Sequence, residues 1–278
     1  MVNGHDYPPL RAFLLVAGPG LACGKRNEKA AGDVRCNPFV TRFSYAVPMV
    51  MYAGSERLVI FDADGTLIDA FHAIEQTFLS HGMAIGDLER FQKRRKLLKY
   101  LGGLREFPNN LRRQFGKQRR KLLLATLTEF YRSEALLYPG IESLLRRLLD
   151  CPDIRVALVT RNVTIEPETT LKHLFARHDI DLGQFDYFAS LSLGEDKTGE
   201  MKRARELYAI NPARACACGD EYGDYLAAIG AGVYPFIVAY GFEDRERLTQ
   251  SFGVPREVIS SSPAEFSDRL LHALGMLV

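Results

Sequence analysis

The feature that most restricts the fold of this chain is the alternation of short apolar runs with helical stretches from Glu56 to the C-terminus. The predicted strands are Leu58–Phe61, Val156–Thr160, Tyr187–Ser190, Ala215–Cys218 and Phe236–Ala239. The predicted helices span 139–150, 164–177, 198–208, 222–231 and 263–275. With right-handed crossovers, this order predicts an α/β fold, a doubly wound parallel sheet that helices cover on both faces.

Two segments depart from this alternation. Residues 72–137 lie between the first two predicted strands and read as helix throughout. The segment is too long for a single crossover, so it predicts a small helical cap domain inserted into a core of 56–71 and 138–278. Residues 1–54 show no lasting helical or strand period and are rich in Gly and Pro. We interpret them as a disordered N-terminal extension or as an over-long gene start, with the working protein beginning near Met51.

The composition is that of a soluble globular protein. Of the 278 residues, 47% are apolar and 25% are charged. No apolar run approaches the length of about 20 residues that crosses a bilayer, so we expect no membrane partner. The five cysteines have no zinc-site spacing, and Cys216 and Cys218 would face one side of a strand as small apolar groups. A reducing cytoplasm is the expected location.

The first predicted strand ends in two carboxylates, within the segment Asp62-Ala-Asp-Gly-Thr66. Ligands of a doubly wound sheet bind beyond the carboxyl ends of its strands, so Asp62 and Asp64 should project into the binding crevice. Gly65 permits the tight turn that follows. A carboxylate attacks a phosphate ester poorly because two anions repel each other. A divalent cation and nearby positive charges remove that obstacle.

Groups that could supply this help follow the later strands. Thr160 ends the second strand with a hydroxyl that can donate to a phosphate oxygen, and Lys197 follows the third as a point charge. Asp220 ends the fourth strand, and Asp224 should lie on the same helix face four residues later. A pair of Asp62 and Asp220 suits Mg²⁺, which prefers carboxylate and water oxygens.

Four motifs follow one another along the chain: the Asp62–Asp64 motif, the strand-end Thr160, Lys197, and the pair of Asp220 and Asp224. In this order they resemble the haloacid dehalogenase (HAD) superfamily over residues 56–240 or more. The position of the cap resembles the C1-capped branch, which includes phosphoglycolate phosphatases and β-phosphoglucomutases. The resemblance implies a Rossmann-like core in which Asp62 forms an aspartyl-phosphate. Asp64 would protonate the leaving oxygen and then activate water, while Thr160 and Lys197 would bind the phosphoryl group.

The resemblance also implies a magnesium site. Asp62, Asp220 and the backbone carbonyl of Asp64 would hold the ion, and Asp224 would support its coordination shell. Members that cleave carbon–halogen or carbon–phosphorus bonds lack the second acid of the motif. Asp64 therefore points to phosphate esters.

Three positions differ from the pattern usual in the capped phosphatases. Thr198 follows Lys197 where Pro is usual, and Glu221 stands where a small residue is frequent and could reach the metal. Arg161 directly follows the strand-end threonine where a smaller or amide residue is expected, and Asn162 comes next. We retain Arg161 and Asn162 as candidate phosphate-binding residues. Lys202 remains a rival for the lysine role.

The expected cap is strongly basic. Residues 90–132 contain 14 Lys or Arg and two acids, whereas the whole chain has a net charge of +2. This distribution fits either a solvated helix face or a field that draws a polyanionic substrate toward the crevice. Candidate contacts are Arg105, Arg112 and Arg113. Nucleic acid is not the expected partner, because base-stacking aromatic residues are sparse in this stretch.

We therefore expect a magnesium-dependent phosphatase that hydrolyses a small phosphorylated metabolite, such as a phosphoglycolate-like monoester. The first alternative is a phosphomutase of the same superfamily, which returns the phosphoryl group to a sugar. The second is a non-catalytic protein that binds polyanions through the basic cap. The sequence leaves the substrate and the oligomeric state open.

Overall fold

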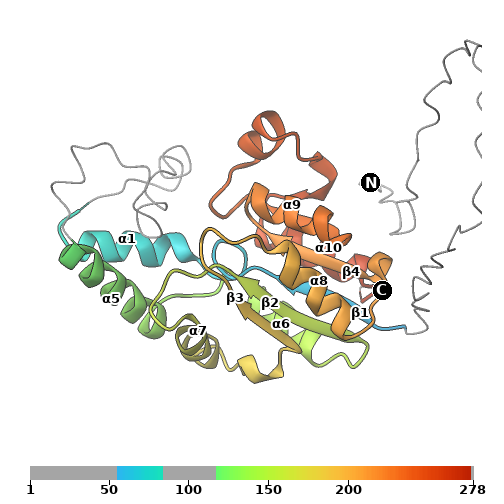
Figure 1. Ribbon diagram of the computed structural model, residues 1–278, viewed down its shortest axis with the longest axis horizontal. Helices are drawn as coiled ribbons and strands as arrows, with labels where there is room; N and C mark the ends of the chain where they lie inside the picture. The colour runs from blue at the N-terminus through green and yellow to red at the C-terminus, as the bar shows by residue number, and fades with distance from the viewer. Residues whose placement is uncertain (1–54, 84–116, 277–278) are drawn as a thin grey trace, which may run out of the picture. The chain divides into compact units, whose positions relative to one another are not determined.

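The structure of this protein is a computed structural model, which describes residues 55–83 and 117–276. Its core is a parallel sheet of six strands in the order β3-β2-β1-β4-β5-β6 (Figure 1). The strands are β1 (Arg57–Phe61), β2 (Ile154–Thr160), β3 (Tyr187–Ser190), β4 (Ala215–Gly219), β5 (Tyr234–Val238) and β6 (Ile259–Ser260). All five predicted strands are present within two residues of their predicted bounds, and the predicted α/β fold is confirmed. The edge strand β6 was not predicted, because two residues carry no detectable period.

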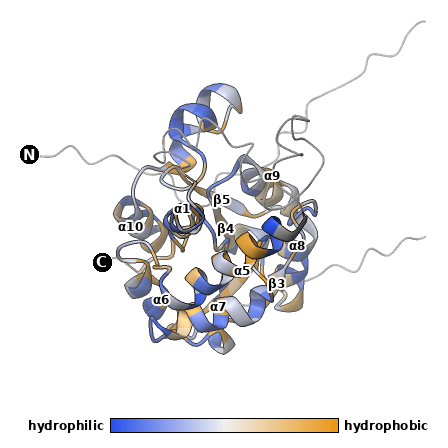
Figure 2. Cartoon of the chain, turned by 90° about the vertical axis from the view of Figure 1, so that its left-hand side faces the viewer, coloured by the Kyte–Doolittle hydropathy of each residue, from blue (hydrophilic) through white to orange (hydrophobic). Residues whose placement is uncertain are grey.

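Helices cover both faces of the sheet. They are α6 (Ile141–Leu149), α7 (Pro167–Ala176), α8 (Thr198–Leu207), α9 (Tyr222–Ala231) and α10 (Pro263–Ala273). Apolar residues of α6, α7 and α10 form one hydrophobic core with β1, and those of α8 and α9 form a second core on the other face. The outward side of α6 is hydrophilic in Figure 2, as expected for a helix with one buried face.

Side chains of β1 show why both faces are covered. Val59 and Phe61 belong to one core, and Leu58 and Ile60 belong to the other. Alternate residues of a strand point to opposite faces, so a strand that is apolar at every position must be buried on both sides. In β4, Cys216 and Cys218 both face the first core, where we expected them to act as small apolar groups.

Two further helices lie beyond the carboxyl ends of the strands, at the left of Figure 1. Helix α1 (Ala70–Ser80) begins after Asp69, whose side chain accepts a hydrogen bond from the backbone N–H of His72 at 3.2 Å. Helix α5 (Lys117–Ser133) packs against α1. Both fall largely within the predicted cap of 72–137, whose boundaries stay a prediction. None of the helices in the described ranges has the length and apolar character to cross a membrane.

Candidate active site

The carboxyl ends of three neighbouring strands place the motif acids close together. In the sheet register, Phe61 at the end of β1 pairs with Leu158 of β2 and with Cys218 of β4. The backbone N–H of Asp62 then donates to the carbonyl of Cys218 at 2.8 Å. This bond fixes the first residue after β1 directly beside the end of β4, where Asp220 follows.

Lys197 joins two of the acids. Its Nζ lies 2.8 Å from Oδ1 of Asp62 and 2.7 Å from Oδ1 of Asp224, and its side chain is 2% exposed. Burial alone would lower the pKa of Lys197, but the charges of Asp224 and Asp62 outweigh it and raise the pKa. The lysine therefore stays charged. Lys202, its rival from the sequence, lies exposed on α8, whereas Lys197 is buried among the motif acids.

Asp220 is completely buried at the end of β4. Its Oδ2 accepts a hydrogen bond from the backbone N–H of Phe242 at 2.6 Å. Its Oδ1 is also buried, and no donor in the described part of the chain bonds to it. Two glycines permit this close packing, since a Cβ at Gly65 or Gly241 would lie 2.1 or 2.4 Å from Oδ2 of Asp220. Asp220 thus has one oxygen held by the backbone and one without a partner.

The three acids fit a divalent cation. One carboxylate oxygen from each of Asp62, Asp220 and Asp224 lies within 4.8 Å of the others, and all three residues are buried. Burial and the charges of Glu221, Asp62 and Asp224 raise the pKa of Asp220 well above its usual range. Uncompensated negative charge of this kind, with an oxygen that lacks a donor, is what a bound cation would neutralise. Oxygen ligands of this type suit Mg²⁺.

Asp62 and Asp64 have different surroundings although a single residue separates them. Burial raises the pKa of Asp62 to about 6, against the opposing effect of the Lys197 charge. Asp64 instead accepts hydrogen bonds from neutral donors, the hydroxyl of Tyr131 at 2.9 Å and the amide of Asn162 at 2.9 and 3.1 Å. Burial, assisted by the charge of Asp62, raises the pKa of Asp64 to about 7. Near neutral pH, Asp64 can therefore give or take a proton.

Thr160 ends β2 two residues beyond the position that pairs with Phe61. Its side chain is fully buried, and its hydroxyl has no hydrogen-bond partner among the residues that the structure describes. A buried hydroxyl without a partner is costly, so its retention at this place fits a donor reserved for a ligand. Thr160 stays our prediction for a phosphate-binding residue.

The two candidates after Thr160 have partners within the protein. The Arg161 guanidinium donates to Oε2 of Glu221 at 3.0 Å and lies 4.0 Å from Oδ1 of Asp224. Asn162 donates to Asp64 and also lines a neighbouring cavity of about 610 Å³. Two of the three positions that depart from the family pattern, Arg161 and Glu221, therefore pair with each other. The cap candidates Arg105, Arg112 and Arg113 lie outside the described residues.

The contact of Tyr131 with Asp64 could not be predicted from the sequence. Tyr131 comes from the last turns of α5, 1% of its surface is exposed, and its hydroxyl meets a motif acid 67 positions earlier in the chain. Burial, together with the charge of Asp64, raises the pKa of Tyr131 well above its usual range, so the phenol remains a donor. A tyrosine at a core position of a helix carries no signal that would distinguish this role from packing.

Comparisons with known proteins agree on one family. A family model described as haloacid dehalogenase-like hydrolase matches residues 56–232. A phosphoglycolate phosphatase of Psychrobacter arcticus is 25% identical over 209 residues, which cover 70% of this chain and 88% of that protein.

Solved structures share the fold. CbbY from Rhodobacter sphaeroides, crystallised in complex with phosphate, superposes with a TM-score of 0.52 and 21% identity, covering 80% of this chain and 99% of that one. A haloacid dehalogenase-like family protein from Streptococcus pneumoniae gives a TM-score of 0.54 and 20% identity, with coverage of 78% and 99%. The family model confirms the predicted family, and the phosphoglycolate phosphatase relative agrees with the predicted class of enzyme, a phosphoric monoester hydrolase. The chain belongs to the haloacid dehalogenase-like hydrolases.

Proposed function

We propose that this protein hydrolyses a small phosphate monoester through a covalent aspartyl-phosphate on Asp62. The observation that carries the proposal is that the carboxylates of Asp62 and Asp64 have different surroundings. Asp62 contacts the cation of Lys197, whereas the hydrogen bonds to the Asp64 carboxylate come from two neutral donors, Tyr131 and Asn162. Two carboxyl groups held in different surroundings can take the separate roles of nucleophile and acid.

In the first step, a carboxylate oxygen of Asp62 attacks phosphorus, and the bond from phosphorus to the ester oxygen breaks. Asp64, in its protonated form, gives its proton to the departing oxygen. In the second step, Asp64 takes a proton from water as that water attacks phosphorus. The bond from phosphorus to Asp62 breaks, which releases inorganic phosphate and restores both acids. Lys197 and the hydroxyl of Thr160 would hold the phosphoryl oxygens throughout.

The residues that would hold Mg²⁺ are Asp62, Asp220 and the Asp64 carbonyl, with Asp224 as a supporting carboxylate. The bound ion would neutralise the charge of the phosphoryl group and thereby remove its repulsion of the nucleophile. The identity of 25% to a phosphoglycolate phosphatase supports a small phosphorylated metabolite, phosphoglycolate among them, as the substrate.

The test is release of inorganic phosphate from a panel of phosphate monoesters, with Mg²⁺ and with excess chelator. We expect metal-dependent release by the wild type. Asp62→Asn should fold normally and lose turnover by about 10⁴-fold or more, because an amide is a far poorer nucleophile. The control is Asp69→Asn, which makes the same change on the same loop at a helix cap that asparagine also fills well. Near-normal turnover by folded Asp62→Asn would overturn the proposal.

The product separates hydrolysis from its alternatives. Transfer of the phosphoryl group to another sugar hydroxyl, without free phosphate, would identify a phosphomutase. Folded protein that acts on no ester, and that binds polyanions with an affinity falling steeply with salt, would identify a binding protein instead.

A further inference from the structure

The strongest unassigned feature of the site is the way Asp64 is held. Tyr131 from α5 and Asn162 from the loop after β2 both donate to its carboxylate. The Asn162 amide cannot simply rotate, because its oxygen accepts bonds from the backbone N–H and the hydroxyl of Thr164. The carboxylate is therefore fixed from two elements that lie far apart in the sequence.

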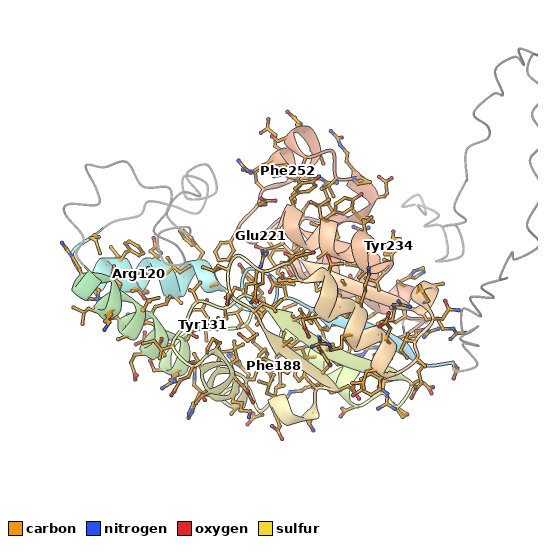
Figure 3. All side chains as sticks on the ribbon, viewed as in Figure 1. Arg120, Tyr131, Phe188, Glu221, Tyr234 and Phe252 are labelled. Carbon is orange, nitrogen blue, oxygen red and sulfur yellow. The ribbon has the colours of Figure 1, made fainter. Side chains whose placement is uncertain are left out.

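The hydroxyl of Tyr131 is itself held in place through α5. Arg177, at the end of α7, donates to the carbonyls of Tyr131 and Ala135 at 3.2 and 2.7 Å. The hydroxyl of Thr128 accepts from the backbone N–H of Ile165 at 2.9 Å. These bonds hold the last turns of α5 against the segment around α7. They therefore fix the position of Tyr131 relative to the core. Figure 3 labels Tyr131 between α5 and the end of the sheet.

A second set of contacts supports the same stretch of α5. Arg132 donates to the hydroxyl of Thr170 and to Oε2 of Glu166, both at 3.1 Å. Glu166 adopts a positive φ of 50°, which is uncommon for a residue with a side chain. An uncommon backbone conformation persists where its surroundings determine it. The turn before α7 thus holds Glu166 where Arg132 of α5, the residue next to Tyr131, can donate to it.

We propose that Tyr131 is a positioning residue that holds the Asp64 carboxyl in the orientation required for proton transfer to the leaving oxygen. The inference rests on the proposed function. The Tyr131 hydroxyl bonds to the Asp64 carboxyl, whose proposed role is proton transfer alone. Removing this hydroxyl should therefore slow cleavage of an ester most when the leaving group needs a proton. An alkoxide leaves poorly unless it is protonated, whereas p-nitrophenolate leaves without a proton. A tyrosine that only packed α5 would affect both esters equally.

The test compares Tyr131→Phe with the wild type on two esters, p-nitrophenyl phosphate and the best alkyl phosphate of the panel. The value measured is kcat/KM, which covers the steps up to cleavage of the ester bond. We expect a loss of about 10- to 100-fold for the alkyl ester and of less than about threefold for the aryl ester. The larger loss stays below most of the roughly 10²- to 10⁴-fold that general acid catalysis supplies, because the variant keeps the acid itself. Phenylalanine keeps the buried ring, and a thermal melt confirms that the variant folds.

Two controls separate positioning from packing. Tyr208→Phe removes another hydroxyl, which bonds to the carbonyl of Asp186 at the other end of β3, and should change neither ester. In an Asp64→Asn background, adding Tyr131→Phe should cause no further loss, because the group it positions is already gone. The inference would be overturned if Tyr131→Phe lowered kcat/KM equally for both esters. It would also be overturned if Tyr131→Phe lowered kcat/KM as much in the Asp64→Asn background as in the wild type. The wild-type rates test the proposed function on their own, whereas the ratio of variant to wild type tests Tyr131.

Discussion

At the scale of single residues, the site depends on which groups surround each acid. Asp62 and Asp64 belong to one loop, but Lys197 contacts the first and neutral donors contact the second. Burial raises the pKa of both, to about 6 and about 7. The same residue type can then attack phosphorus at one position and exchange a proton at the other.

Gly241 is a residue on which the cation site should depend. A Cβ at this position would lie 2.3 Å from the carbonyl of Gly65 and 2.4 Å from Oδ2 of Asp220, closer than atoms can approach. Gly241→Ala must therefore shift the packing of Asp220 against Gly65 and the loop after β5. We expect the Mg²⁺ concentration for half-maximal turnover to rise by about 10-fold or more, as it does when groups supporting a metal ligand are disturbed. A titration of activity with Mg²⁺ measures it.

Gly194→Ala is the matched control for this prediction. A Cβ at Gly194 would meet no atom within 4 Å, and the residue does not need a positive φ. This variant should keep the wild-type dependence on Mg²⁺. The same dependence in Gly241→Ala would show that Asp220 does not require the close approach of the loop after β5.

At the scale of helices and strands, α5 and α7 pack against each other beside the site. Arg177 donates to the carbonyl of Tyr131 in the last turn of α5 and to that of Ala135 just after the helix. Carbonyls in the last turn of a helix have no partner within it. Arg177→Met keeps much of the side-chain volume and removes both donors. We expect it to lower the free energy of unfolding by about 1–3 kcal/mol, because part-buried carbonyls lose their partners. Urea denaturation measures this change.

Lys172→Met is the control at this scale. Lys172 lies on the same helix and pairs with Glu168 at 2.8 Å, but both side chains are more than half exposed. Exposed pairs contribute little, so this variant should change the free energy of unfolding by less than about 0.5 kcal/mol. If Arg177→Met lowers the free energy of unfolding no more than the control does, the bonds from Arg177 to the two carbonyls are not needed for stability.

At the scale of the whole molecule, the family match and the site occupy one continuous part of the chain. The family model begins at residue 56, the first strand begins at Arg57, and every acid of the site follows it. We therefore expect deletion of residues 1–50 to leave kcat and KM essentially unchanged. Steady-state kinetics of the shortened and full-length chains test this. A large loss of turnover on deletion would show that the N-terminal segment belongs to the working enzyme.

The sequence by itself determined the order of strands and helices and the residues that end the strands. Apolar periodicity is a local property, so it located β1 to β5 from short windows of sequence. Carboxyl ends of parallel strands meet at one edge of a sheet. For that reason Asp62, Lys197, Asp220 and Asp224 could be expected together. In the structure one oxygen of each acid lies within 4.8 Å of the others, and Lys197 contacts two of the acids.

Only the tertiary structure decided the contacts made across long separations in the chain. It placed Tyr131 on Asp64, paired Arg161 with Glu221 and brought the Phe242 backbone to Asp220. Each contact depends on how a helix or loop packs against the sheet, to within about the length of one hydrogen bond. A periodic pattern tells which face of a helix is buried, but not which residue of that face meets a given side chain, because packing of the whole core sets that register.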